Sequence, residues 1–318
     1  MKRLVVTILA AALLISSCGT GKKSKAPAPQ TRDFPRVEIP AMITDPQDRM
    51  LWMCNHMWDK FTSTDKLYHS DSLTVNGVKL EDLENQMGAF ATMLLELPVE
   101  EGARAVSAWY GRLDAFQRAF PGCNMLPQNA ALAAKYFYDP NSPVRSEDLY
   151  LPFVQKLAES DLIDPDYRAA YAWDAQKCAL NRIGTVAADF TFIDTAGKRR
   201  TLHSIKADRI LLIFGNPDCH ACKEITENLE NIPELQDLIH NGSLKVVDIY
   251  IDEDIDLWKS KSATYPATWI NGYDPDFAIR GDLIYNIRAV PSVYLLDGDK
   301  RVILKDSPIE RIYPAILN

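Results

Sequence analysis

The sequence predicts an all-α region over residues 41–182, followed by an α/β region over residues 183–318. Two observations indicate the α/β region. The unbroken apolar run at 210–214 is typical of a strand buried on both faces. A second run, at 244–251, is apolar apart from Lys245 and Asp248 and follows an intervening stretch with helical spacing, so it also predicts a buried strand. After it we expect a short strand at 267–270, a short helix at 282–285 and a last helix at 309–317. Before residue 183 the apolar residues recur with the period of a helix instead.

The helical region begins with a clear start signal. Asp45 is a cap candidate, and Pro46 stands at the first helical position. Cys54 then lies on the apolar face, which favours a buried structural cysteine over a metal ligand. Proline and glycine punctuate the rest, and we expect further helices at 80–97, 99–120, 128–138, 146–160 and 164–181. We find no set of residues there that indicates catalysis.

The chemistry is indicated by a Cys-x-x-Cys motif directly after the first buried strand. A turn at 215–218 separates the strand from Cys219 and Cys222, which stand where a helix begins. The free N–H groups and the positive end of a helix dipole favour a thiolate there. We therefore expect Cys219 to be the nucleophile and Cys222 to resolve a mixed disulfide.

Two other interpretations of the motif are weaker. Zinc needs four ligands, but the chain has no second Cys-x-x-Cys and its five histidines are scattered. A purely structural disulfide would close a short, strained loop. The sequence therefore predicts redox work without a metal or another cofactor.

A second motif lies far downstream, where Pro291 opens a strand-like run that ends in a hairpin signal at 297–299. With the buried strand and the Cys-x-x-Cys helix, the stretch 184–318 resembles the thioredoxin fold. The resemblance implies that the Val290–Pro291 bond is cis and that Pro291 faces the cysteines. It also implies that Val290 and Pro291 position an extended substrate segment by strand-like pairing.

The hairpin pattern at 187–202 resembles the N-terminal hairpin of the TlpA-like branch, whose members are membrane-anchored and extracytoplasmic. The chain departs from its relatives around the cysteines. Asp218 stands where many have tryptophan, and Ile225 stands where TlpA-like relatives often have glutamate. The buried aspartate that thioredoxins carry on the preceding strand is absent. The sequence does not identify the group that accepts the proton of Cys222. Glu224 either takes the place of the missing carboxylates or is solvated on the helix surface.

His220, between the two cysteines, can donate to the Cys219 thiolate or attract it when protonated. That interaction stabilises the reduced form and makes the disulfide more oxidising. Asp218 acts in the opposite direction, because it places a like charge beside the thiolate. The alternative for His220 is a solvent-exposed spacer.

The N-terminus is typical of an exported protein. A short basic start precedes an apolar run at 4–15, which is too short to span a bilayer. The run ends at Cys18 in a pattern that resembles the lipobox of bacterial lipoproteins; the alternative is an ordinary signal peptide. We assign 1–18 to this leader and 19–40, rich in Gly, Lys, Ala and Pro, to a flexible tether. Acylation of Cys18 would anchor the protein to a membrane.

The charge balance excludes one class of partner. The chain has 35 basic and 43 acidic residues, a net charge of −8, and removal of the leader makes it two units more negative. So acidic a protein is not expected to bind nucleic acid. The three remaining cysteines, Cys54, Cys123 and Cys178, allow at most one internal bridge.

The sequence thus predicts a lipid-anchored envelope thiol–disulfide oxidoreductase, facing the periplasm from the outer membrane. Its partners would be protein disulfides or dithiols and an envelope electron donor or acceptor. Its N-terminal part resembles a helical domain of unknown function that precedes thioredoxin-like domains in some Gram-negative lipoproteins, through the junction at 181–184. Two alternatives stay open: a non-catalytic binding module, and a peroxide-reducing enzyme, although its Thr-x-x-Cys pattern is missing.

Overall fold

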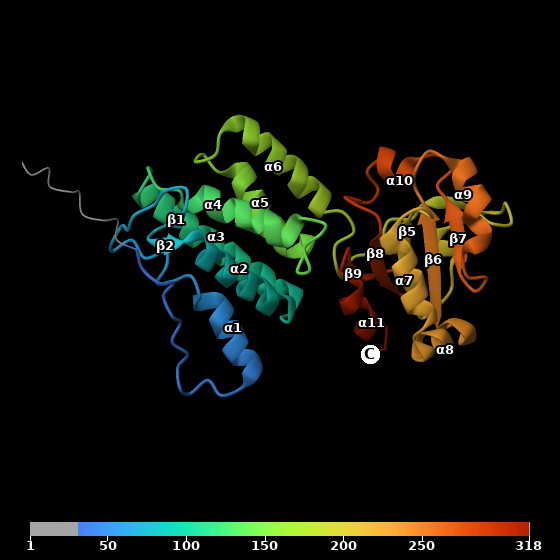
Figure 1. Cartoon of the computed structure of the whole chain (residues 1–318), viewed down its shortest axis with the longest axis horizontal. Helices are drawn as coiled ribbons and strands as arrows, with labels where there is room; N and C mark the ends of the chain where they lie inside the picture. The colour runs from blue at the N-terminus through green and yellow to red at the C-terminus, as the bar shows by residue number, and fades with distance from the viewer. Residues whose placement is uncertain (1–30, 318) are drawn as a thin grey trace, which may run out of the picture.

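A computed structural model describes residues 31–317 of the chain. Helices α1 to α6 form one part of the molecule, and a seven-stranded sheet with its own helices forms the other (Figure 1). The leader, Cys18 and the first part of the predicted tether lie outside the described residues. Among the residues that the structure describes, no helix has the length and apolarity needed to cross a membrane.

The helical part contains every helix that the periodicity predicts. Asp45 caps the first helix by accepting hydrogen bonds from the backbone of Gln47 and Asp48. A single π-helical turn, Ala134–Tyr138, extends the fourth helix. The helices are α1 (Pro46–His56), α2 (Leu80–Leu95), α3 (Val99–Ala119), α4 (Met125–Ala133), α5 (Glu147–Glu159) and α6 (Pro165–Cys178).

One small hairpin interrupts the helices. Strands β1 (Thr74–Val75) and β2 (Val78–Lys79) pair antiparallel across Asn76 and Gly77, both of which have positive φ. Asn-Gly favours this tight turn because both positions tolerate the left-handed region. The sequence analysis did not predict the hairpin, since its strands are too short to show a period of two.

Aromatic side chains fill the centre of the helical part. Trp58 and Trp109 are fully buried and stack with their ring centroids 5.1 Å apart. Phe90 contacts both indoles at their edges, and Phe153 packs on Trp109 at 4.7 Å. Large buried rings of this kind supply much of the hydrophobic stabilisation of a core. This core is separate from the two that cover the sheet.

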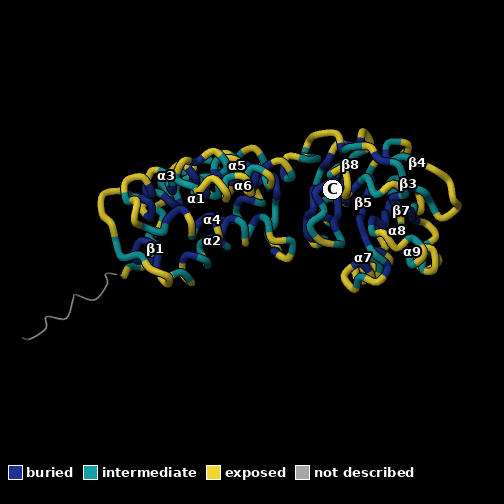
Figure 2. Tube along the Cα trace, turned by 90° about the horizontal axis from the view of Figure 1, so that it is seen from above, coloured by how far each residue is buried: buried dark blue, intermediate teal, exposed yellow. Residues whose placement is uncertain are grey.

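The sheet has the strand order β4-β3-β7-β6-β5-β8-β9. The central strand is β6, and β5 beside it pairs parallel with β6 and antiparallel with β8. The central strands are buried, whereas α7 carries exposed residues on its outer side (Figure 2). The strands are β3 (Thr191–Asp194), β4 (Arg199–Thr201), β5 (Arg209–Gly215), β6 (Leu244–Tyr250), β7 (Ile270–Tyr273), β8 (Ser292–Asp297) and β9 (Val302–Lys305).

The alternation of side chains along the central strands decides which residues meet the helices. On β5, Leu211 and Ile213 pack against the helices α7 (His220–Glu230), α8 (Pro233–Asn241) and α11 (Ile309–Leu317). Leu212 and Phe214 point to the opposite face, where Tyr285 packs on Phe214. Asp248 lies on the neighbouring strand β6 and pairs in register with Ile213 of β5.

Two predicted elements near the active-site side are displaced. The short helix expected at 282–285 lies earlier, as α10 (Ala278–Gly281), because the buried Asp274 carboxylate accepts a hydrogen bond from the Ile279 backbone N–H. The short strand expected at 267–270 lies later, as β7, and joins the main sheet parallel to β6. Helix α9 (Ile255–Lys261) precedes it and buries Trp258.

The two parts of the molecule are joined by a buried charged contact. The Glu147 carboxylate at the start of α5 is fully buried and lies 3.1 Å from Arg288 Nε and 2.7 Å from Lys305 Nζ. Asn286 also donates to it, at 2.6 Å. Arg288 in turn donates to Asp306 at 2.6 Å. Every partner of Glu147 named here belongs to the α/β part, so this carboxylate fixes the helical part against it.

Backbone contacts reinforce the junction. The Lys305 ammonium also donates to the carbonyl oxygens of Cys178 and Leu180, where α6 ends. Cations are favourable at the C-terminal end of a helix, where carbonyl groups lack partners. Arg311 on α11 donates to the Leu95 carbonyl at the end of α2. The junction therefore contains polar groups that would be unpaired if the two parts separated.

We predict that Glu147→Ala lowers the stability of the chain by about 3–5 kcal/mol, because it leaves the buried Arg288 and Lys305 charges without their shared partner. Urea unfolding followed by circular dichroism measures this loss. Glu159→Ala, at an exposed position of the same helix, is the matched control and should change stability by less than about 0.5 kcal/mol. Equal unfolding midpoints for the two variants would show that the buried contact contributes little.

Candidate active site

The two cysteines of the motif lie at the start of α7. Cys219 is the N-cap residue, and its Sγ accepts a hydrogen bond of 3.2 Å from the Cys222 backbone N–H. Cys219 is half-buried, whereas Cys222, inside the first turn, is 8% exposed. Both are thiols. The helix thus presents one sulfur to solvent and holds the other beneath it.

Burial is the main reason why the pKa of the Cys222 thiol is raised, and the neighbouring Cys219 sulfur adds to the effect. Cys222 is therefore a protonated thiol at neutral pH. A thiolate is the attacking species in disulfide exchange. The accessible Cys219 is the sulfur placed to meet a substrate first, and Cys222 needs a proton acceptor before it can react.

The loop before β8 lies beside the first cysteine. The Val290–Pro291 bond is cis, as the resemblance to thioredoxin implies. The Cys219 thiol donates to the Val290 carbonyl oxygen at 3.7 Å. Within the described part of the chain, no backbone hydrogen bond is made by the N–H groups of Ala289 and Val290. The Cys219 sulfur therefore contacts the Val290 backbone, and the N–H groups of Ala289 and Val290 beside it have no backbone partner among the described residues.

The charged side chains next to the cysteines in the sequence, Asp218, His220 and Glu224, are exposed and contact charged partners of their own. The His220 side chain is 88% exposed, and its Nε2 lies 3.3 Å from the Glu224 carboxylate one turn along the helix. Glu224 is 58% exposed. Asp218 forms an ion pair with Lys261 on α9. Of the two roles left open for Glu224, the structure thus places it on the solvated surface of α7.

A carboxyl group that the sequence analysis missed lies beneath the motif. Asp248 is 3% exposed, on the face of the sheet that α7 covers. Burial raises the pKa of this carboxyl to about 7. Its negative charge in turn contributes to the raised pKa of Cys222. Its signal in the sequence is a single acidic residue in a strand whose other residues, Lys245 apart, are apolar.

Gly215 makes room for this carboxyl. A Cβ atom at position 215, the last residue of β5, would lie 3.2 Å from Asp248 Oδ2. That approach is closer than van der Waals contact, so the absent side chain allows the carboxyl to lie under the turn that leads to Cys219. Asp248 Oδ1 has no hydrogen-bond partner among the described residues. A buried carboxyl oxygen without a partner is free to accept a proton from a neighbour.

Tyr265 covers the other side of the buried cysteine. It follows α9 and, with Asn216, Pro217 and Cys222, lines a pocket of about 300 Å³. Burial raises the pKa of Tyr265, and the negative charges of Asp248 and Cys222 add to this effect. The segment that carries Tyr265 lies between β6 and β7, so this part of the chain adds to the surroundings of Cys222.

The other described cysteines are far less suited to redox chemistry. Cys54 and Cys178 are buried in the helical part, and burial raises the pKa of Cys54 to about 12. Cys123 is half-buried, and its thiol donates to the side-chain oxygen Oε1 of Gln117 at 3.4 Å. All three are free thiols. The burial of Cys54 agrees with the structural role predicted for it.

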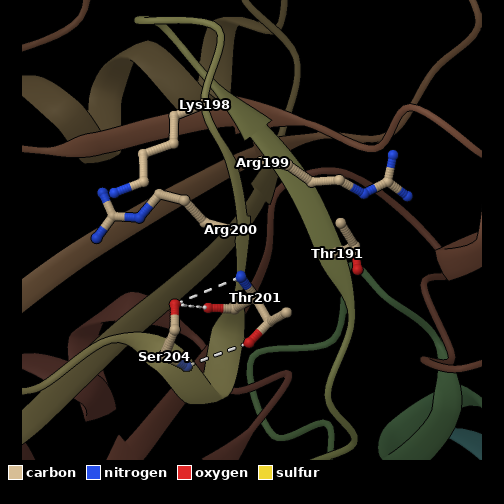
Figure 3. Close-up of a pocket in the computed structure, with 6 residues that line it drawn as sticks. All are labelled: Thr191, Lys198, Arg199, Arg200, Thr201 and Ser204. Carbon is tan, nitrogen blue, oxygen red and sulfur yellow. Dashed lines mark hydrogen bonds between the residues drawn. The ribbon is translucent and has the colours of Figure 1, made fainter.

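A shallow depression at the far edge of the sheet is not part of this site. The β3–β4 hairpin lines it, with Thr191, Arg199, Arg200 and Ser204 among its residues (Figure 3). Arg199 forms an ion pair with Asp276, and Arg200 lies 3.7 Å from Asp194. The depression has no cysteine in its lining, and both of its arginines already have a carboxylate partner.

Comparison with known proteins agrees with this architecture. Residues 17–175 match the family described as "Domain of unknown function (DUF5106)". A thioredoxin-like protein from Bacteroides caccae is 31% identical; the similarity covers 90% of this chain and 98% of that one, with a TM-score of 0.76. No curated protein matches the chain.

Two further solved structures match less than half of the chain. The C-terminal domain of an uncharacterized protein from Bacteroides fragilis is 38% identical over 43% of this chain and 99% of that one, with a TM-score of 0.42. The thioredoxin domain of a thiol-disulfide oxidoreductase from Bacteroides vulgatus is 20% identical over 42% of this chain and 95% of that one, with a TM-score of 0.38. The family match over residues 17–175 and the 31% identical Bacteroides caccae structure together decide the relationship: the chain belongs to the DUF5106 family and is a thioredoxin-like protein.

Proposed function

We propose that this protein is a lipid-anchored envelope thiol–disulfide oxidoreductase of the TlpA-like kind. The observation that carries the proposal is the pair of unequal thiols at the start of α7. Cys219 is accessible and touches the Val290 carbonyl, and Cys222 is buried one turn inside. Disulfide exchange requires one sulfur that can be reached and a second that can resolve the product.

The reaction begins when the Cys219 thiolate attacks one sulfur of a substrate disulfide. A Cys219–substrate bond forms, the substrate disulfide breaks, and the leaving thiolate takes a proton from solvent. The Cys222 thiolate then attacks the Cys219 sulfur and releases the second substrate thiolate. Two electrons have passed to the substrate, and the protein holds a Cys219–Cys222 disulfide. A dithiol partner drives the same steps in reverse.

Asp248 supplies the proton acceptor that the second step needs. The Cys222 thiol must lose its proton in a buried place, where solvent has little access. The Asp248 carboxyl lies on the sheet face beneath the same helix and has an unpaired oxygen. With a pKa of about 7 it is a carboxylate above neutral pH and can take the proton. Glu224, at the surface and paired with His220, is less well placed.

The substrate segment would pair with the loop before β8. Val290 and Pro291 lie beside Cys219, and the free Ala289 and Val290 N–H groups are donors for an extended chain. Strand-like pairing binds any polypeptide through its backbone. This property suits protein substrates whose sequences differ around the cystine.

The leader supports the compartment. Its lipobox-like end at Cys18 would place the protein on a membrane, and disulfides persist in the periplasm. Of the tether predicted at 19–40, the end around Phe34 packs on Trp58 and Phe61, so the residues before it would let the folded part reach away from the lipid surface. Outer-membrane attachment facing the periplasm is the arrangement that we propose.

Cys219→Ser should abolish reduction of a protein disulfide such as that of insulin, because no accessible thiol remains. Cys222→Ser should instead accumulate mixed disulfides, since the resolving thiol is missing. Insulin turbidity and non-reducing gels followed by mass spectrometry measure the two outcomes. Cys123→Ser is the matched control and should keep full activity. Trapping by the Cys219→Ser variant alone would reverse the assignment of the two sulfurs.

Asp248→Asn should slow the resolution step by about 10²-fold, the lower end of what general-base catalysis contributes. In the unchanged protein the rate of resolution should rise with pH through about 7, as the carboxyl loses its proton. The variant should lose this rise. Stopped-flow release of a preformed mixed disulfide between pH 5 and 9 measures both. Asp237→Asn, an exposed carboxyl on α8, is the control. An unchanged pH profile in Asp248→Asn would assign the proton to another group.

Cys18→Ala should remove the lipid and leave the protein in the soluble fraction, since no other anchor is proposed. Metabolic labelling with a fatty acid and membrane fractionation provide the measurement. Ser17→Ala, one residue earlier, is the control and should remain labelled. Absence of label on the unchanged protein would contradict the lipoprotein assignment.

A further inference from the structure

A groove of about 320 Å³ opens next to the cysteines, where the two parts of the molecule meet. Helix α7 forms one side, where Ala221, Ile225 and Asn228 line the groove. Another is the loop at Val290 and Pro291, the same loop whose carbonyl contacts Cys219. The groove is therefore lined by the loop that contacts the reactive sulfur and by Ala221, two residues after Cys219.

The helical part supplies a wall of this groove. Pro140, Asn141 and Arg145 line it, and all three belong to the loop between the π-helical turn and α5. A thioredoxin-like sheet with its own helices would leave this side open. Here it is closed by residues that lie about 150 positions away from the Val290–Pro291 loop in the sequence.

Hydrogen bonds hold the wall in place. Arg145 Nε donates to the Asp306 carbonyl at 2.8 Å, which ties the loop to the α/β part. The Ser142 hydroxyl donates to the Tyr136 carbonyl at 2.6 Å, and the Asn141 N–H donates to Asp139 at 2.8 Å. The loop is therefore a fixed surface, suited to positioning a substrate.

The opposite wall is held by the same part of the chain. Arg288, two residues before Val290, lies 3.1 Å from the buried Glu147 carboxylate. Glu147 comes two residues after Arg145 in the sequence. One short segment of the helical part thus both lines the groove and fixes the loop that faces it.

The lining indicates which side chains fit. The apolar part of the lining includes Ile225, Val293 and Ile309. The charged part has two carboxylates, Glu224 and Glu310, and one cation, Arg145, whose Nε already donates to the Asp306 carbonyl. An apolar side chain would be desolvated against the apolar lining, whereas an acidic one would meet two like charges and a guanidinium that is already engaged.

We propose that the helical part forms one wall of the substrate site, and that the groove takes an extended polypeptide segment with an apolar side chain near its half-cystine. An extended chain advances about 3.3 Å per residue, so the neighbours of a cysteine held at Cys219 reach the groove. The free Ala289 and Val290 N–H groups lie on that path. This proposal rests on the proposed function, because it assigns the substrate of the same thiol pair.

The test compares two probes on variants of the full chain. One is dithionitrobenzoate, a small disulfide that needs only Cys219. The other is a short peptide with valine beside a cysteine that carries a thionitrobenzoate disulfide. Asn141→Trp fills the groove from the wall and should lower the second-order rate constant of the reduced protein with the peptide about tenfold, the effect of one well-packed contact. The rate with dithionitrobenzoate should stay within about twofold of the unchanged protein.

Asn85→Trp places the same side chain on the exposed face of α2, outside the groove, and should leave both rates unchanged. A peptide with aspartate in place of valine should react more slowly with the unchanged protein and lose less in Asn141→Trp. Equal rates for Asn141→Trp and the unchanged protein with the valine peptide, or equal losses with both probes, would overturn the assignment of the wall. An unchanged protein that is inert toward dithionitrobenzoate would instead overturn the proposed function.

Discussion

The position of helix α7 on the sheet is the constraint on which the rest of the site depends. Its apolar side, from Cys222 through Ile225 to Leu229, is buried against β5 and its neighbours. This packing presses the first turn onto the carboxyl end of β5. Cys219 caps the turn and stays accessible, and Cys222 is drawn over Asp248. The different surroundings of two chemically identical thiols follow from the burial of one helix face.

The helical part contributes to the structure of the site. Its Glu147 carboxylate lies between Arg288 and Lys305, one on the approach to the Val290–Pro291 loop and the other on β9. Burying a carboxylate is costly unless it is paired and hydrogen-bonded, and here the partners come from the α/β part. Removing the helical part would take the Glu147 carboxylate away from both cations and would leave Arg288 with Asp306. The active-site loop is therefore supported from outside its own sheet.

Much of the fold could be predicted because its signals are local. The buried strand at 210–214, the helix after Cys222 and the final helix follow from periodicity and turn residues alone. The last of these, α11, has the bounds 309–317 that the pattern predicts. The β1–β2 hairpin was missed because two-residue strands show no period. The helix before Pro291 was misplaced because the Asp274 side chain, which fixes its start, acts through a tertiary contact.

For the site, too, the residues with local sequence signals could be predicted, and those placed by tertiary contacts could not. Cys219, Cys222 and the Val290–Pro291 loop stand out as motifs, and the structure brings Cys219 and Val290 together. Asp248 could not be assigned from its strand, since only the parallel pairing of β5 and β6 places it beneath Gly215. His220 lies between the cysteines in sequence, yet its ring pairs with Glu224 in space. The groove wall at Pro140 to Arg145 depends on how two parts of the chain pack, which no motif records.

The most direct test of the account is a redox titration of the full chain in glutathione or dithiothreitol buffers, with peptide mapping at each potential. The account predicts one reversible two-electron transition, in which a Cys219–Cys222 disulfide forms while Cys54 and Cys178 remain thiols. A pair that stays reduced under all conditions, or a disulfide that joins either sulfur to another cysteine, would contradict it.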